Sequence, residues 1–76
     1  MKANIREALD RYVSHHCPTG DFLYAVLCND LRESFWRADE ENMADLYDIV
    51  SYCYNEIPST CWGSKEKVEL WLSTPV

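Results

Sequence analysis

Histidine and cysteine side chains gather at one point of this chain, at His15, His16 and Cys17. A histidine close to a cysteine can take the thiol proton and leave a nucleophilic thiolate. Neighbouring residues at a helix end point apart, however, and a charged histidine there also stabilises the helix dipole. Few other polar residues are expected to converge in so short a chain. The sequence therefore predicts a protein that is not an enzyme and has no catalytic residues.

The same side chains would bind zinc only if distant parts of the chain met. Zinc requires four ligands in a tetrahedral arrangement, so the loop after the first expected helix would have to reach the loop after the third. The spacing of the cysteines matches no zinc motif and includes no C-x-x-C pair. We therefore expect no metal, no cofactor and reduced thiols, as is usual in the cytosol. The ligands of such a site would be His15, His16, Cys17, Cys53 and Cys61.

Acidic side chains are concentrated beside aromatic ones in the middle of the chain. The net charge is −6, and residues 30–48 contain seven acids but two bases. Because nucleic-acid binding needs a basic footprint, no direct contact with duplex nucleic acid is expected. Tyrosine and tryptophan are enriched at protein interfaces, so an acidic, aromatic surface is predicted to bind a protein with a basic groove. Its residues would be Trp36, Asp39, Glu40, Glu41, Asp45, Asp48 and Tyr52, with Tyr47 as an alternative anchor.

A plainer interpretation of the same residues is a corner between two helices, in which the acids cap a helix and the aromatics join the core. Acids in the first turn of a helix complement the positive end of its dipole. Capping explains the acids at 39–41 but not those that follow at Asp45 and Asp48. Both interpretations stay open at this stage.

A polar pair, Asn29 and Asp30, interrupts the apolar pattern that precedes it. A buried carboxylate needs a partner, so Asp30 is expected either to form an ion pair at the edge of the core or to line a polar pocket. Such a pocket would suit a nucleotide or another small ligand, held within or between the subunits of a homo-oligomer. Its lining would be Asn29, Asp30, Arg32, Arg37 and Tyr54.

Amphipathic helices would position all of these residues. Apolar side chains recur at helical spacing in four segments. The segments are residues 4–16, 20–37, 39–57 and 64–73. The loops between these segments are short, which favours a compact all-α bundle of about four helices. The expected N-caps are Asn4, Asp39 and Ser64.

Each expected helix has an apolar face for a common core. The face of the second helix is wide, whereas that of the third helix is long and regular. The predicted inward residues are Ile5, Ala8, Leu9, Tyr12, Val13, Phe22, Leu23, Val26, Leu27, Leu31, Phe35, Met43, Leu46, Tyr47, Val50, Cys53, Tyr54, Ile57, Val68, Trp71 and Leu72.

The length of 76 residues predicts a single domain spanning 1–76. No apolar run approaches the roughly 20 residues that cross a bilayer, so no contact with a membrane is expected. The first residues alternate in charge and lack the apolar stretch of a signal peptide. These features predict a cytoplasmic protein.

The segments "PTGDFLYAVLCNDL", "RADEEN" and "YNEIPSTCWGSKEKVELWL" resemble a group of short, mostly uncharacterised proteins encoded in bacteriophages, prophages and plasmids. The resemblance spans about residues 5 to 73. It implies an accessory protein of a mobile genetic element, located in the cytoplasm of a bacterial host. It supplies no catalytic residues, and it favours a function in binding and interference over one in catalysis.

Two functions follow from these observations. In the first, the protein is a non-enzymatic binding module that binds a host or phage macromolecule through its acidic, aromatic helical surface. It would act as an inhibitor or a nucleic-acid mimic. In the second, it is a homo-oligomer that binds a nucleotide or another small ligand and sequesters a signal molecule. A thermal-shift screen against nucleotides would separate the two.

Overall fold

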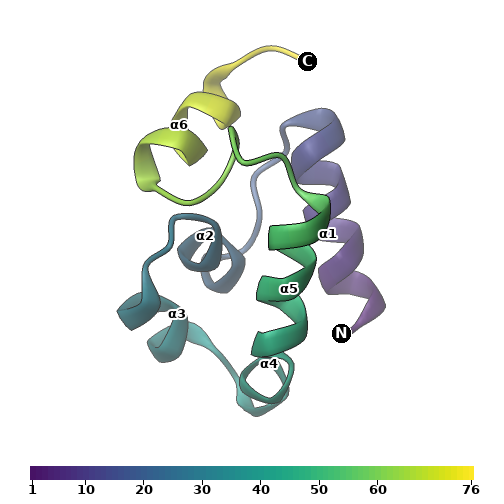
Figure 1. The fold of residues 1–76 in the computed structure, drawn as a ribbon, viewed down its shortest axis with the longest axis vertical. Coiled ribbons are helices and arrows are strands. Elements are labelled where there is room, and N and C mark those ends of the chain that lie inside the picture. Colours follow the sequence, from purple (N-terminus) through teal and green to yellow (C-terminus); the bar gives the residue numbers. More distant parts are fainter.

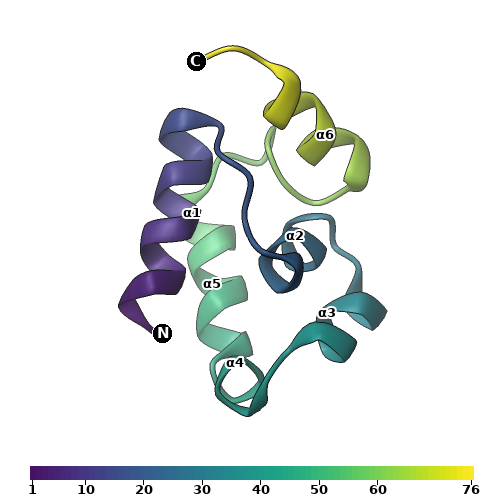
Figure 2. The same ribbon diagram turned by 180° about the vertical axis from the view of Figure 1, so that it is seen from behind.

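The computed structural model describes residues 1–76 and contains helices but no strands. The predicted all-α fold is confirmed, but the four-helix bundle is not, because six shorter helices are present. They are α1 (Ala3–His15), α2 (Asp21–Leu27), α3 (Leu31–Arg37), α4 (Glu40–Ala44), α5 (Leu46–Glu56) and α6 (Lys65–Ser73). Figures 1 and 2 show α1 and α5 side by side, with α2 next to them and α6 across one end.

The helix expected over 20–37 is divided at Asn29 and Asp30. Asn29 adopts the left-handed conformation with a φ of 59°, and helices commonly end at such a residue. Asp30 then caps α3, since its carboxylate accepts a hydrogen bond from the backbone N–H of Glu33 at 3.1 Å. The expected ion pair of Asp30 at the core edge is wrong, because this residue is exposed and serves as a cap.

The helix expected over 39–57 also consists of two parts. Asp39 caps α4 as predicted, accepting a hydrogen bond from the backbone N–H of Asn42 at 2.7 Å. The chain turns at Asp45, where φ is −92° and ψ is 0°, and α5 continues in another direction (Figure 1). Backbone N–H groups of Asp45 and Ile49 still donate to carbonyls four residues earlier. The turn therefore leaves these backbone groups paired.

The first and last helices begin differently. The residue before α1 is Lys2, which makes no side-chain capping bond, so the prediction of a cap at Asn4 is wrong by two residues. Ser64 caps α6 as predicted, and its hydroxyl accepts a hydrogen bond from the backbone N–H of Lys67 at 3.2 Å.

The core lies where α1, α2, α5 and α6 meet. Its buried residues are Leu9, Tyr12, Phe22, Leu23, Val26, Leu27, Ile49, Cys53, Ile57, Cys61 and Val68. Three hydrogen bonds fasten the segment after α5 to this core. The Tyr12 hydroxyl donates to the carbonyl of Cys61 at 2.6 Å, the Trp71 indole N–H to the carbonyl of Tyr12 at 2.8 Å, and the backbone N–H of Gly63 to the carbonyl of Leu27 at 2.7 Å.

The predicted inward face of α3 is wrong. Leu31 is 76% exposed and Phe35 is 64% exposed, whereas Ser34 is buried. The Ser34 hydroxyl donates to the carbonyl of Asp30 at 2.7 Å, so its burial leaves no polar group unpaired. The break at Asn29 interrupts the helical register, and a stripe that is continuous in the sequence is therefore not continuous in space.

The predicted inward face of α5 is wrong in part. Ile49 and Cys53 face the core, with no exposed surface. Tyr47 and Tyr54 are 83% and 79% exposed, and Val50 is 40% exposed. Residues 47, 50 and 54 share one side of a helix because they are three and four positions apart. This helix therefore has two apolar sides, of which the core covers one.

Candidate protein-binding surface

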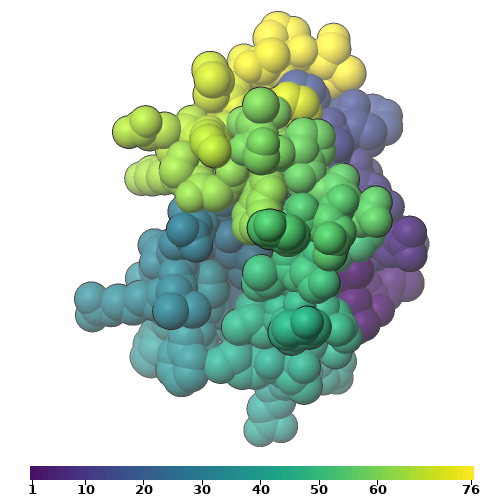
Figure 3. Space-filling model, in the orientation of Figure 1, coloured from purple at the N-terminus to yellow at the C-terminus, as the bar shows by residue number.

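Large apolar side chains remain exposed on α3, α4 and α5. We call this set the aromatic face. It consists of Leu31, Phe35, Trp36, Met43, Tyr47, Val50 and Tyr54. Single exposed apolar residues are ordinary on protein surfaces, whereas contiguous sets mark interaction sites. Figure 3 shows the side of the molecule on which α3 and α5 are both visible.

All members of the aromatic face except Tyr47 line one of three depressions. A central groove of about 80 Å³ between α3 and α5 has Val26 and Ser34 at its base and Leu31, Val50 and Trp62 along its sides. A lower hollow of about 420 Å³ lies at the α3–α4 corner. Its lining is Phe35, Trp36, Ala38, Asp39, Glu40 and Met43. An upper hollow of about 580 Å³ shares two residues with the groove and is lined by Asn29, Tyr54, Ile57, Ser59, Trp62, Gly63 and Lys67.

The acids that line these depressions have no cationic partner within the protein. Asp30 lines the groove, and Asp39 and Glu40 line the lower hollow. All three are exposed, and none takes part in an ion pair. Their charge is therefore available to a partner that contacts the aromatic face.

The other acids predicted for the binding surface lie elsewhere and have partners. Glu41 forms an ion pair with Lys2, with an N–O distance of 2.7 Å. The interaction with Glu41 raises the pKa of the Lys2 ammonium. Asp45 and Asp48 lie 4.0 and 3.9 Å from the terminal amine of Met1. The structure thus divides the predicted acidic set into two groups.

Of the predicted aromatic anchors, Trp36 belongs to the aromatic face and Tyr52 does not. Trp36 is 78% exposed and lines the lower hollow beside Asp39 and Glu40. Tyr52 lies against α1, where its hydroxyl donates to the Asp10 carboxylate and its ring lies under the guanidinium of Arg6. The hydrogen bond to Asp10 raises the pKa of the Tyr52 hydroxyl.

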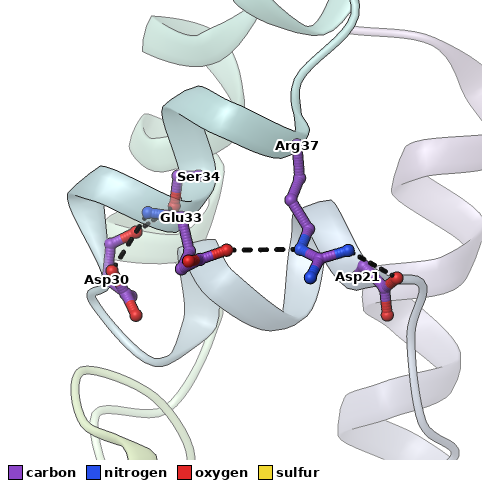
Figure 4. A network of polar contacts seen from close by, with 5 residues as sticks. All are labelled: Asp21, Asp30, Glu33, Ser34 and Arg37. Carbon is purple, nitrogen blue, oxygen red and sulfur yellow. Dashed lines mark hydrogen bonds and ion pairs between the residues drawn. The ribbon is translucent and has the colours of Figure 1, made fainter.

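The residues predicted for a ligand pocket are not brought together. Asp30 and Arg37 line a separate hollow between α2 and α3 with Asp21 and Glu33. In Figure 4, the Arg37 guanidinium donates to Glu33 at 3.3 Å and to Asp21 at 3.1 Å. This cation is therefore already paired, and the three carboxylates of the hollow outnumber its two cations, Arg37 and Lys65. The remaining residues are dispersed, with Asn29 and Tyr54 in the upper hollow and Arg32 beside Trp36.

The histidines and thiols have structural surroundings. His16 stacks on the Trp71 ring at a centroid distance of 4.0 Å, and its Nδ1 donates to the carbonyl of Trp71 at 2.7 Å. The Cys61 thiol donates to the carbonyl of Pro58 at 3.2 Å. Burial raises the pKa of the Cys53 thiol to about 11, which suppresses the reactive thiolate. Nowhere do three or more His, Cys, Asp or Glu side chains cluster as a metal site would require.

Sequence reasoning had placed Leu31, Phe35, Met43 and Val50 in the core, and so had missed them as surface residues. One signal was available, because Ile49 lies outside the stripe predicted for 39–57 and places an apolar residue on a second side of that helix. None of the six helices combines the length and the apolar character needed to cross a bilayer. Comparisons with protein-family models, with curated proteins and with solved structures find no match for this chain.

Proposed function

We propose that this protein is a non-enzymatic binding module that holds a partner protein against its aromatic face. The observation that carries the proposal is the exposure of Leu31, Phe35, Trp36, Tyr47 and Tyr54, each of them 64–83% accessible. Binding hot spots are enriched in tryptophan and tyrosine, and they lie at the centre of an interface, where water is excluded.

Simple energetics favour such a partner. Complete burial of one large apolar side chain contributes roughly 1.5–3 kcal/mol. Several such residues together are comparable to the roughly 4–15 kcal/mol that association costs in lost freedom of motion. Burial of the aromatic face would thus offset a large part of this cost.

Charge favours a basic partner. The chain carries a net charge of −6, and Asp30, Asp39 and Glu40 adjoin the aromatic face without ion-pair partners. Complementary charge accelerates encounter and excludes wrong partners. Together with the resemblance to short proteins of phages, prophages and plasmids, this supports a host or phage macromolecule in the bacterial cytoplasm as the partner, with inhibition or mimicry of nucleic acid as the outcome.

The alternative of a nucleotide-binding homo-oligomer has less support. Arg37 is held between two carboxylates, and a phosphate would have to displace them. Of the five residues predicted for that pocket, the upper hollow brings together Asn29 and Tyr54, beside one cation, Lys67. A thermal-shift screen against nucleotides tests this alternative, since a bound ligand raises the melting temperature.

Affinity capture from a bacterial lysate tests the proposed function. The bait is the wild-type protein, and the test variants are Leu31→Ser and Val50→Glu. The matched control is Leu70→Ser, because Leu70 on α6 is 68% exposed but lies outside the aromatic face. We expect a partner that is captured by the wild type and by the control but lost with both test variants.

Circular dichroism should show the same helicity in all four proteins, because exposed substitutions such as those at Leu31 and Leu70 usually change stability by less than about 0.5 kcal/mol, and Val50, which is 40% exposed, contributes little surface to the core. Higher salt should weaken the capture, since charges at the rim are screened over about 8–10 Å. A partner retained equally by Leu31→Ser and Val50→Glu would place the binding surface elsewhere and overturn the proposal.

A further inference from the structure

We infer that the aromatic face receives a basic amphipathic α-helix of the partner, lying along the groove between α3 and α5. The inference rests on the proposed function and specifies the element that is bound. Helix-in-groove recognition uses apolar anchors at positions i, i+3 or i+4, and i+7. The three depressions along the aromatic face provide one place for each anchor.

The depressions follow one another along the face. The central groove and the upper hollow share Asn29 and Trp62. The central groove and the lower hollow share no lining residue, but they are neighbours along α3, because Leu31 of the groove and Phe35 of the hollow are one helical turn apart. Anchors at i, i+4 and i+7 advance about 11 Å along a helix, and they would follow one another in the same order as the three depressions.

Charge indicates the direction of the bound helix. The lower hollow contains Asp39 and Glu40, whereas the upper hollow contains Lys67. A helix has a partial positive charge at its N-terminus and a partial negative charge at its C-terminus. The N-terminus of the bound helix therefore lies at the lower hollow, and its C-terminus lies near Lys67. Basic residues in its first turns would contact Asp39 and Glu40.

Other occupants fit less well. A second copy of this chain carries the same net charge of −6, so association of two copies is opposed by repulsion between like charges. An extended strand would find no sheet edge to extend, because the fold contains only helices. A proline-rich segment would use the aromatic side chains, but it would lack the anchor spacing that three consecutive depressions require.

Selection from a displayed library of random peptides, about 15 residues long, tests the inference. The targets are the wild-type protein and, as counter-selection, Val50→Glu. We expect enriched sequences with apolar residues at i, i+4 and i+7 and a surplus of Lys and Arg towards the N-terminal end. Enriched peptides that are proline-rich, acidic or without helical periodicity would overturn the inference, and so would the absence of any enrichment.

An enriched peptide is then synthesised, and its affinity is measured by the fluorescence change of the protein. Glu40→Lys should weaken binding about three- to tenfold, because it replaces an attraction by a repulsion between exposed charges. Glu66→Lys is the matched control, since Glu66 is also exposed in the first turn of a helix but lies on α6. Equal losses with both variants would overturn the assigned position of the basic residues.

A spin label at the N-terminus of the peptide reports its direction. It should broaden the NMR signals of α4 more than those of α6, and the reverse pattern would overturn the assigned direction.

Failure of this inference can be distinguished from failure of the proposed function. If lysate capture depends on Leu31 and Val50 but no helical peptide is selected, the proposed function holds and this inference fails. If lysate capture does not depend on those residues, the proposed function itself fails.

Discussion

Asn29 adopts a backbone conformation that most residues avoid. For an ordinary L-residue the left-handed region costs roughly 1–2 kcal/mol, while asparagine enters it more readily and glycine enters it freely. With a φ of 59°, this one residue ends α2 and allows α3 to begin at a different angle. The direction of α3, and hence the opening of the central groove, depends on it.

Asn29 therefore supports a first prediction. Replacement by Ala should lower the free energy of unfolding by about 1 kcal/mol, because alanine has no local hydrogen bond to offset the strain. Replacement by Gly should change the free energy less, since glycine accepts this φ without strain. Urea denaturation measures both. Equal losses for the two variants would show that the side chain, and not the backbone, is what matters at this position.

The four thiols differ in their surroundings. Cys53 and Cys61 are fully buried, whereas Cys17 and Cys28 are partly accessible. Burial raises the pKa of the thiols of Cys28, Cys53 and Cys61. Because only the thiolate reacts with alkylating reagents, the raised pKa slows the reaction of Cys28, Cys53 and Cys61.

We therefore predict ordered labelling of the native protein. Iodoacetamide at neutral pH should modify Cys17 first, while Cys53 and Cys61 should react only after denaturant has opened the core. Peptide mapping by mass spectrometry identifies the modified residues. Rapid labelling of Cys53 in the native protein would contradict its burial on the inner side of α5.

At the scale of elements, α5 has two apolar sides, of which one is buried and the other is exposed. Ile49 and Cys53 pack into the core, while Val50 and Tyr54 lie on the aromatic face. A helix with apolar residues on two sides normally has neighbours on both. The exposed side of α5 is the one that the proposed partner would cover.

Adjacent residues on α5 allow a matched test. Ile49→Ala should lower the free energy of unfolding by roughly 2–5 kcal/mol, because it leaves a cavity in a packed core. Val50→Ala should cost less than about 1 kcal/mol, since 40% of Val50 is already exposed and little surface is lost from the core. Chemical denaturation of both variants provides the comparison. Equal losses would contradict the division of α5 into a core side and an exposed side.

At the scale of the whole molecule, buried ionisable groups couple stability to alkaline pH. Burial raises the pKa of the Cys53 thiol from 9.0 to about 11, and burial also raises the pKa of the Tyr12 hydroxyl. A group with a raised pKa stabilises the fold below its unfolded pKa, where both states hold the proton. That stability is lost as the pH rises through the folded pKa.

The free energy of unfolding should therefore remain level up to about pH 8 and fall between pH 9 and pH 11. The contribution of Cys53 has an upper limit of roughly 2–3 kcal/mol. Denaturation with urea across this pH range measures the fall, and Cys53→Ala should make it shallower. A slope that is unchanged in Cys53→Ala would assign the alkaline loss to other groups.

Local patterns in the sequence determined the helical content, the caps at Asp39 and Ser64, and the inner faces of α1 and α6. These features depend on neighbours within a few residues, so spacing and residue type are sufficient to predict them. The break at 29–30 is also local. Asn followed by Asp, with Glu33 three positions after Asp30, is the pattern of a helix end next to a new cap, although the apolar residues on both sides favoured a single helix.

Only the tertiary structure decided which apolar residues are buried. Periodicity identifies apolar residues on a helix, but the packed neighbours determine which of them are covered. On α5 the neighbouring helices cover Ile49 and Cys53 and leave Tyr47 and Val50 outside. The same holds for the acids, because the sequence contains all of them, whereas the fold separates Asp39 and Glu40, which are free of ion pairs, from Glu41, which is paired with Lys2.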